Sequence, residues 1–132
     1  MKYLLDTNIC IYLIKRKPES VIQRLEALPS TDICLSSIAF FEMMYGAAKS
    51  QFPERNAQTA IDFFSLYETL TFDNQDALVA GYIRAGLAKE GRIIGPYDLQ
   101  IAGQAKRRGI TLVTNNTKEF ERVNGLKLEN WV

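Results

Sequence analysis

The chain has 132 residues, a formal net charge of +1, 47% hydrophobic residues and 23% charged residues. This balance is typical of one globular domain, here spanning residues 1–132, and no apolar stretch reaches the roughly 20 residues that a membrane-spanning helix requires. The chain contains no histidine, which excludes Ser-His-Asp and Cys-His catalytic sites, RNA cleavage by paired histidines and zinc binding by imidazole.

Short apolar runs alternate along the chain with longer amphipathic segments. The runs predict strands at residues 3–5, 32–35, 70–72, 111–114 and 126–128. The segments between them predict helices at residues 8–15, 18–28, 36–48, 53–67, 73–89 and 97–108, with Gly109 closing the last. Strands that alternate with helices predict an α/β fold, in which a central parallel sheet carries helices on both faces.

The N-terminal segment and the two cysteines bear on where the protein works. Asp6 and Asn8 interrupt the apolar run at the start of the chain, and no small-residue cleavage site follows, so we do not expect a signal peptide. We expect a cytoplasmic protein that does not bind membranes. In a reducing compartment Cys10 and Cys34 are expected to be buried free thiols.

Asp6 ends the first apolar run, at the point where the first strand is expected to end. A carboxylate at the carboxyl end of a parallel strand lies where open α/β sheets bind their ligands. Thr7 or Asn8 can cap the helix that follows. The alternative is that Asp6 itself only satisfies backbone donors at this turn.

Glu42 lies in a segment that is apolar nearly all round, from Ile38 to Tyr45, and such a helix is expected to be buried. A buried carboxylate must be paired with a cation or take up a proton. No lysine or arginine lies one helical turn away, so a local salt bridge is excluded. A distant arginine and a bound cation both remain possible partners, and we favour the bound cation.

Asp98 follows Gly95-Pro96 at the start of a predicted helix, where it could serve only as a cap. Helix starts in this kind of fold also open onto the carboxyl edge of the sheet, where Asp6 is expected. The turn Thr114-Asn115-Asn116 leaves a predicted strand at the same edge, although asparagines are common turn residues in general. We therefore expect Asp6, Glu42, Asp98 and this turn to converge on one pocket.

Three carboxylates without histidine or thiolate form a hard oxygen site, which suits Mg²⁺ and allows Mn²⁺ to substitute. We expect Asp6 and Asp98 to ligate the ion, with Glu42 acting through a water molecule or as the base. Such an ion recruits phosphate oxygens and activates water, so phosphodiester hydrolysis is the natural chemistry. An aspartyl phosphatase is less suitable, because Asn8 stands where its second aspartate is usually found.

Four motifs resemble those of a known family: Leu4-Leu5-Asp6-Thr7-Asn8, Ser36-Ser37-Ile38 with Glu42 and Gly46, Ile94-Gly95-Pro96-Tyr97-Asp98 with Ile101-Ala102, and Val113-Thr114-Asn115-Asn116 with Glu119-Phe120. In this order and spacing they resemble the VapC toxins, which are PIN-domain ribonucleases of type II toxin–antitoxin systems. The resemblance covers essentially the whole chain. It implies a Mg²⁺- or Mn²⁺-dependent endoribonuclease that usually forms dimers and is neutralised by a VapB antitoxin.

The resemblance also implies roles for individual residues. Asp6, Glu42 and Asp98 match the acidic triad of the family, and Thr114 matches a threonine near its fourth acidic position. Asn116 stands where many members have an aspartate, so a tightly bound second metal is not expected. The ending Asn115–Phe120 is similar to that of enzymes which cut initiator tRNA in its anticodon stem-loop and so block translation.

Two basic clusters are candidate RNA contacts, Lys15-Arg16-Lys17 and Lys106-Arg107-Arg108, although such a cluster is more often just a solvated helix face. Two other functions remain open: a non-catalytic partner that binds an antitoxin and helps it repress its promoter, and a DNA-directed nuclease. A binding module would have no need to bury Glu42, so we favour the ribonuclease. In that case the larger VapB complex would contact promoter DNA only through the antitoxin.

Overall fold

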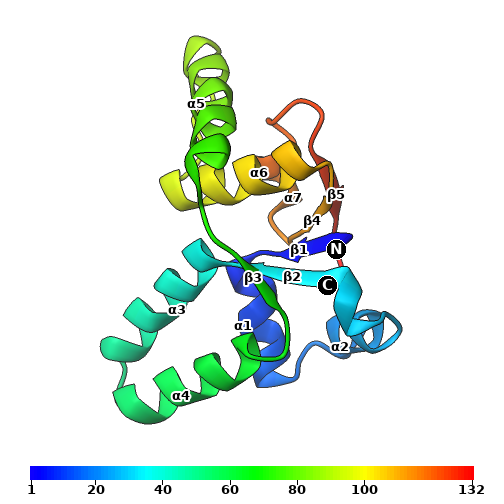
Figure 1. The fold of residues 1–132 in the computed structure, drawn as a ribbon, viewed down its shortest axis with the longest axis vertical. Helices are drawn as coiled ribbons and strands as arrows, with labels where there is room; N and C mark the ends of the chain where they lie inside the picture. Colours follow the sequence, from blue (N-terminus) through cyan, green and yellow to red (C-terminus); the bar gives the residue numbers. More distant parts are fainter.

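The computed structural model describes all residues, 1–132, and contains a five-stranded sheet in which every strand is parallel to its neighbours (Figure 1). The strands are β1 (Tyr3–Leu5), β2 (Ile33–Ser36), β3 (Glu68–Leu70), β4 (Thr111–Val113) and β5 (Lys127–Glu129), in the spatial order β3-β2-β1-β4-β5. The predicted α/β fold is confirmed. Because the order runs outward from β1 in both directions, the crevice that binds ligands in such sheets lies between the carboxyl ends of β1 and β4.

Helices cover both faces of the sheet. On one face lie α1 (Thr7–Lys15), α2 (Glu19–Glu26), α3 (Ser37–Ala48) and α4 (Pro53–Phe64). On the other face lie α5 (Asn74–Lys89), α6 (Pro96–Arg108) and the short α7 (Thr117–Phe120). In Figure 1, α6 lies directly over the sheet, while α5 extends well beyond it.

The alternation of side chains along each strand explains why the core has two parts. Leu4, Cys34 and Leu112 are fully buried against α5 and α6, whereas the next residue of each strand, such as Leu5 or Val113, is fully buried against α1 to α4. A strand buried on both faces must be apolar at successive positions. This is why short continuous apolar runs predicted the central strands.

Several element boundaries differ from those predicted. Asp6 itself caps α1, because its Oδ1 accepts a hydrogen bond from the Ile9 amide at 2.9 Å. Pro18 precedes α2 and does not lie in its first turn. Helix α4 ends at Phe64, and β3 occupies residues 68–70, two residues earlier than expected. Helix α7 and a 3₁₀ turn at Ser30–Asp32 were not predicted, because both are too short to show a periodic pattern.

Helices α5 and α6 approach each other closely at Gly103. A Cβ atom added there would lie 2.9 Å from the Cβ of Ala80 and 3.2 Å from its backbone nitrogen, so only glycine fits without a shift of one helix. This contact fixes how α6, which carries Asp98, crosses α5.

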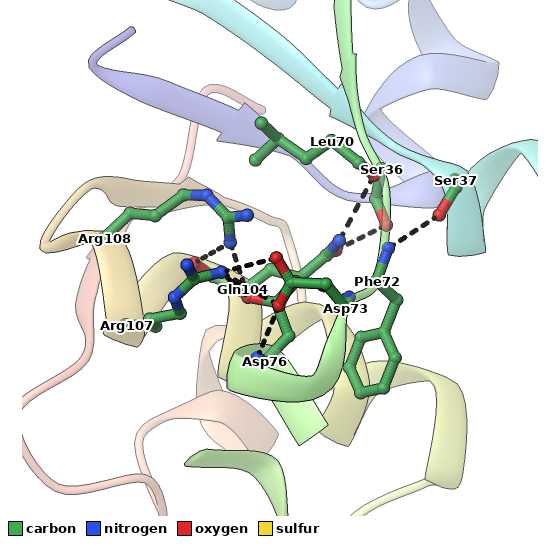
Figure 2. A network of polar contacts seen from close by, with 9 residues as sticks. All are labelled: Ser36, Ser37, Leu70, Phe72, Asp73, Asp76, Gln104, Arg107 and Arg108. Carbon is green, nitrogen blue, oxygen red and sulfur yellow. Dashed lines mark hydrogen bonds and ion pairs between the residues drawn. The ribbon is translucent and has the colours of Figure 1, made fainter. Parts of the chain in front are cut away.

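A buried polar network ties the same two helices to the sheet (Figure 2). Asp76 at the start of α5 is fully buried and pairs with Arg107 at 3.0 Å and Arg108 at 2.7 Å. Gln104, also fully buried, accepts a hydrogen bond from the Ser36 hydroxyl at 2.6 Å and donates one to the carbonyl of Leu70. Every buried side-chain polar atom has a partner, as expected for a network that stabilises rather than strains the fold.

The cysteines are as expected: Cys10 and Cys34 are both buried and free. None of the helices combines the length and the apolar character that crossing a bilayer would require.

Candidate active site

Asp6 lies at the carboxyl end of β1, next to β4. The register pairs Leu5 with Val113, and the Asp6 amide donates to the Val113 carbonyl at 3.0 Å, so Asp6 stands beside Thr114. Both residues are buried, Asp6 to 3% exposure and Thr114 completely. Burial raises the pKa of Asp6 to about 6, although hydrogen bonds from Thr114 and the Ile9 amide act in the opposite direction.

Glu42 belongs to α3, and the structure corrects the expectation that this helix is buried all round. Glu42 is only partly buried, because α3 leaves Phe41 and Tyr45 exposed to solvent. One carboxylate oxygen of Glu42 accepts a hydrogen bond from the Thr7 hydroxyl at 2.7 Å. Thr7 follows Asp6 directly, so this bond holds the Glu42 carboxylate toward the carboxyl edge of the sheet.

Asp98 lies in the first turn of α6 and is partly buried. Burial raises the pKa of Asp98 to about 6, and the negative charge of Glu119 contributes next. The charges of Asp6 and Glu42 raise it further. The three predicted acids therefore lie near one another, and Asp6, Glu42 and Asp98 line one pocket of about 670 Å³.

Glu119 is a fourth acid at this site to which the sequence assigned no role. Its Oε1 accepts a hydrogen bond from the Gly95 amide at 3.0 Å, and its Oε2 accepts one from the Asn116 side chain at 2.7 Å. The Gly95 bond places its charge at the start of α6, beside Asp98. The signal in the sequence was an acid three residues after Asn116, on a turn that leaves β4.

Thr114 and Asn116 stabilise the turn after β4. The Thr114 hydroxyl accepts a hydrogen bond from the Asn116 amide at 2.9 Å, while the Asn116 side chain is engaged by Glu119. The Thr114 side chain also hydrogen-bonds to Asp6, so this turn contacts both Asp6 and Glu119. At this end of β4 the charged candidate for a fourth ligand is therefore Glu119, and not Asn116.

The donor set fits a hard divalent cation. The side-chain atoms of the pocket that could ligate a metal are carboxylate, hydroxyl and amide oxygens, and a bound cation would favour the ionised forms of Asp6 and Asp98, whose pKa values burial raises. No three acidic side chains lie close enough together to ligate one ion between them. An ion here would thus be held by two carboxylates with water completing its shell, as is usual for Mg²⁺.

The two predicted RNA-contacting clusters differ in placement. Lys15, Arg16 and Lys17 are exposed at the end of α1, and Lys15 lines a groove that also contains Thr7 and Glu42. Lys106, Arg107 and Arg108 lie at the end of α6 remote from Asp98, about 15 Å away along the helix. Arg107 and Arg108 are held in ion pairs with Asp73 and Asp76 (Figure 2), so part of the charge of this cluster is already neutralised, and its contact with RNA stays a prediction.

Comparison with known proteins agrees with this geometry. The PIN domain family matches residues 3–126. The chain is 50% identical over 131 residues to the tRNA(fMet)-specific endonuclease VapC of Shigella flexneri, covering 99% of this chain and 98% of that protein. It is 46% identical over 132 residues to ribonuclease VapC2 of Haemophilus influenzae, covering 100% and 99%. The crystal structure of DNA-bound VapBC from Salmonella typhimurium superposes with a TM-score of 0.94 at 47% identity, covering 100% of this chain and 99% of the other.

A five-stranded parallel sheet with carboxylates gathered at its carboxyl edge, beside the strand-order switch, defines a small α/β protein with an acidic pocket. With full-length relatives at this level of identity, the chain belongs to the PIN-domain family and, within it, to the VapC ribonucleases.

Proposed function

We propose that this protein is the toxin of a type II toxin–antitoxin system, an endoribonuclease that cuts initiator tRNA in its anticodon stem-loop. The acidic pocket is the observation that carries the proposal, because Asp6, Glu42 and Asp98 from three separate elements share it. The substrate is supported by the relatives from Shigella flexneri and Salmonella typhimurium, both called tRNA(fMet)-specific endonucleases.

The reaction is proposed to depend on Mg²⁺, with Mn²⁺ as a substitute, held by Asp6 and Asp98. When bound, the ion would supply positive charge to the scissile phosphate and acidity to a coordinated water. Hydrogen bonds from Thr114 and the Ile9 amide keep Asp6 in place at the edge of the pocket. Glu42 uses one oxygen to accept from Thr7, and its other oxygen is available to take a proton from the attacking water.

Control is proposed to come from a VapB-type antitoxin, as the solved VapBC complexes suggest. An arginine of the antitoxin could offer two hydrogen bonds to Asp6 and Asp98 and replace the metal. Beside the acids, a groove of about 400 Å³ lined by Ile11, Ile14 and other apolar groups between α1, α3 and α4 could take the antitoxin's apolar side chains. Tyr12 on the same helix is partly buried, as Ile11 and Ile14 are, and its hydroxyl accepts a hydrogen bond from the Asn115 side chain. Dimerisation and assembly into a larger complex with the antitoxin, which alone would contact promoter DNA, belong to the same proposal.

One experiment tests this function directly. The purified protein is incubated with initiator tRNA, elongator methionine tRNA and double-stranded DNA, in Mg²⁺ or in EDTA, and the new 5′ ends are mapped. We expect a single cut in the anticodon stem-loop of the initiator tRNA, in Mg²⁺ only, and none by Asp98→Asn. Cleavage of DNA, cleavage in EDTA or full activity of Asp98→Asn would each contradict a separate part of the proposal.

A further inference from the structure

Three exposed aromatic side chains line the same pocket as the acids. Phe41 is 52% exposed and Tyr45 60% exposed, both on α3, and Tyr97 on α6 is 43% exposed. Phe41 directly precedes Glu42 in the sequence, and Tyr97 directly precedes Asp98. Rings that stay this exposed beside an acidic centre contribute little to the core, so their position calls for another explanation.

The rings are arranged so that flat faces stay open. Phe41 and Tyr97 meet edge to face, with centroids 5.5 Å apart and planes at 62°, so their mutual contact leaves ring surface uncovered. Tyr45 lies one helical turn beyond Phe41, and the Nζ of Lys49 lies 4.7 Å from the centroid of its ring. Phe41 and Tyr45 on α3 and Lys49 directly after its end therefore follow one another at intervals of four residues, on one side of the helix.

Charge explains why an RNA-cutting site would need such a surface. The acids repel phosphate, and Lys49 is the only cationic side chain among the residues that line the pocket. Affinity for a nucleotide must therefore come largely from uncharged contacts, and stacking on aromatic rings is the contact that every base can make.

We propose that Phe41 and Tyr97 form a nucleobase subsite, which stacks an unpaired base next to the scissile phosphate while Lys49, beside Tyr45, contacts a neighbouring phosphate. This inference rests on the proposed function, because it takes RNA as the substrate. It adds the means by which a single strand is held, and it explains why a presented loop would be preferred to a duplex, in which the bases are already stacked.

A protein segment is the other possible occupant, and the neighbouring groove argues against it. That groove, beside α1 and α4, is lined by aliphatic groups such as Ile14, Met43 and Ala60 and by no aromatic ring. An apolar protein side chain is better accommodated there. The aromatic part of the acidic pocket is better suited to a flat base.

The test measures binding in the Asp98→Asn background, in which the RNA should stay intact. The probes are fluorescent oligoadenylate and an abasic oligoribonucleotide with the same number of phosphates. Phe41→Leu and Tyr97→Leu remove a ring but keep an apolar group. Phe41→Tyr and Tyr97→Phe restore the ring, and Phe52→Leu removes an exposed ring that lies outside the pocket.

We expect each leucine variant to bind oligoadenylate roughly 5- to 150-fold more weakly, the ratio that corresponds to about 1–3 kcal/mol per stacked base. Binding of the abasic probe should not change, the ring-restoring variants should recover binding, and Phe52→Leu should match the parent. Equal affinity of the parent for the two probes would overturn the subsite without use of any ring variant. An equal loss on both probes would also overturn it.

Antitoxin binding and stem-loop cleavage are measured on the same ring variants in the wild-type background. If the leucine variants keep their base-dependent RNA binding but lose antitoxin binding, the rings are a protein-docking surface and the proposal is wrong. If the wild type binds bases as expected but cuts no RNA, the ribonuclease assignment fails while the base subsite stands.

Discussion

Asp6→Asn separates the charge of the most buried acid in the pocket from its structural role. Asp6 caps α1 by accepting a hydrogen bond from the Ile9 amide at 2.9 Å. Asparagine is as good a cap as aspartate and has nearly the same shape. The substitution should therefore keep the cap and remove only the negative charge.

The pKa of Asp6 gives the size and the sign of the effect. Its pKa rises from 3.8 to about 6 on folding, which corresponds to about 3 kcal/mol that opposes folding once the carboxyl is ionised. Below about pH 4 Asp6 is protonated in both states, and the penalty is absent. As the pH rises from about 4 to about 6 the unfolded state ionises first, so stability falls, and above about pH 6 the full penalty remains.

We therefore expect Asp6→Asn to be more stable than the wild type by up to about 3 kcal/mol at pH 8, or on the order of 10 °C in Tm, in EDTA. The difference should shrink between pH 6 and pH 4 and vanish below. Urea unfolding at pH 4, 6 and 8 measures it. Mn²⁺ should stabilise the wild type and not the variant, and RNA cleavage should be lost.

Asp73→Asn is the matched control. Asp73 also caps a helix, α5, by accepting from the Asp76 amide at 2.9 Å, but it is exposed. That backbone hydrogen bond, together with Arg107, lowers the pKa of Asp73. Its substitution should thus lower stability at neutral pH, the opposite sign to Asp6→Asn. The reasoning is refuted if Asp6→Asn is less stable than the wild type at pH 8, or if any gain persists unchanged at pH 4.

Three further predictions follow from the packing and the charges. Gly103→Ala should lower the free energy of unfolding, because the added methyl would lie 2.9 Å from the Cβ of Ala80. The control Gly81→Ala meets nothing within 4 Å and should raise the free energy of unfolding by up to about 1 kcal/mol. Thermal unfolding measures both, and equal effects would contradict the close approach at Gly103. Glu119→Gln should weaken Mn²⁺ binding and slow RNA cleavage, because it removes a negative charge beside Asp98. Glu121→Gln, which changes an exposed acid nearby, is the control. If calorimetry gives the same Mn²⁺ affinity for both variants, Glu119 does not belong to the site. Arg108→Ala should destabilise the fold by about 1–3 kcal/mol, because it removes a hydrogen-bond partner of the buried Asp76 carboxylate. RNA affinity should stay unchanged. Unchanged stability together with weaker RNA binding would instead support the Lys106–Arg108 cluster as an RNA contact.

Local sequence was enough to predict most of the architecture. Continuous apolar runs predicted the central strands because parallel strands covered on both faces must be apolar at successive positions. Gly109 ends α6 with a φ of 65°, as the pattern predicted. The weak edge strand was misplaced: β3 exposes Glu68 and Thr69, so only one of its three residues carries the apolar signal from which strands are recognised.

The sequence also indicated which acids would share a pocket, because strand ends and helix starts of a parallel sheet meet at one edge. Asp6 and Asp98 could be placed by this rule. Glu42 could not be placed as well, since an apolar helix can be buried or can present aromatic groups to a ligand, and only the packing of α3 against α4 and α6 decided which of its faces remained open.

What only the tertiary structure decided depends on partners far apart in the chain. The hydrogen bond from Gly95 to Glu119 joins residues 24 positions apart, and the ion pair between Arg108 and Asp76 joins residues 32 apart. Local pattern showed an acid at position 119 but not its contact with Gly95, and it did not show that Arg107 and Arg108 are ion-paired. Both arise where helices and turns are brought together by burial of the two apolar cores, and the short-range preferences that form helices and strands do not specify which polar side chains then meet.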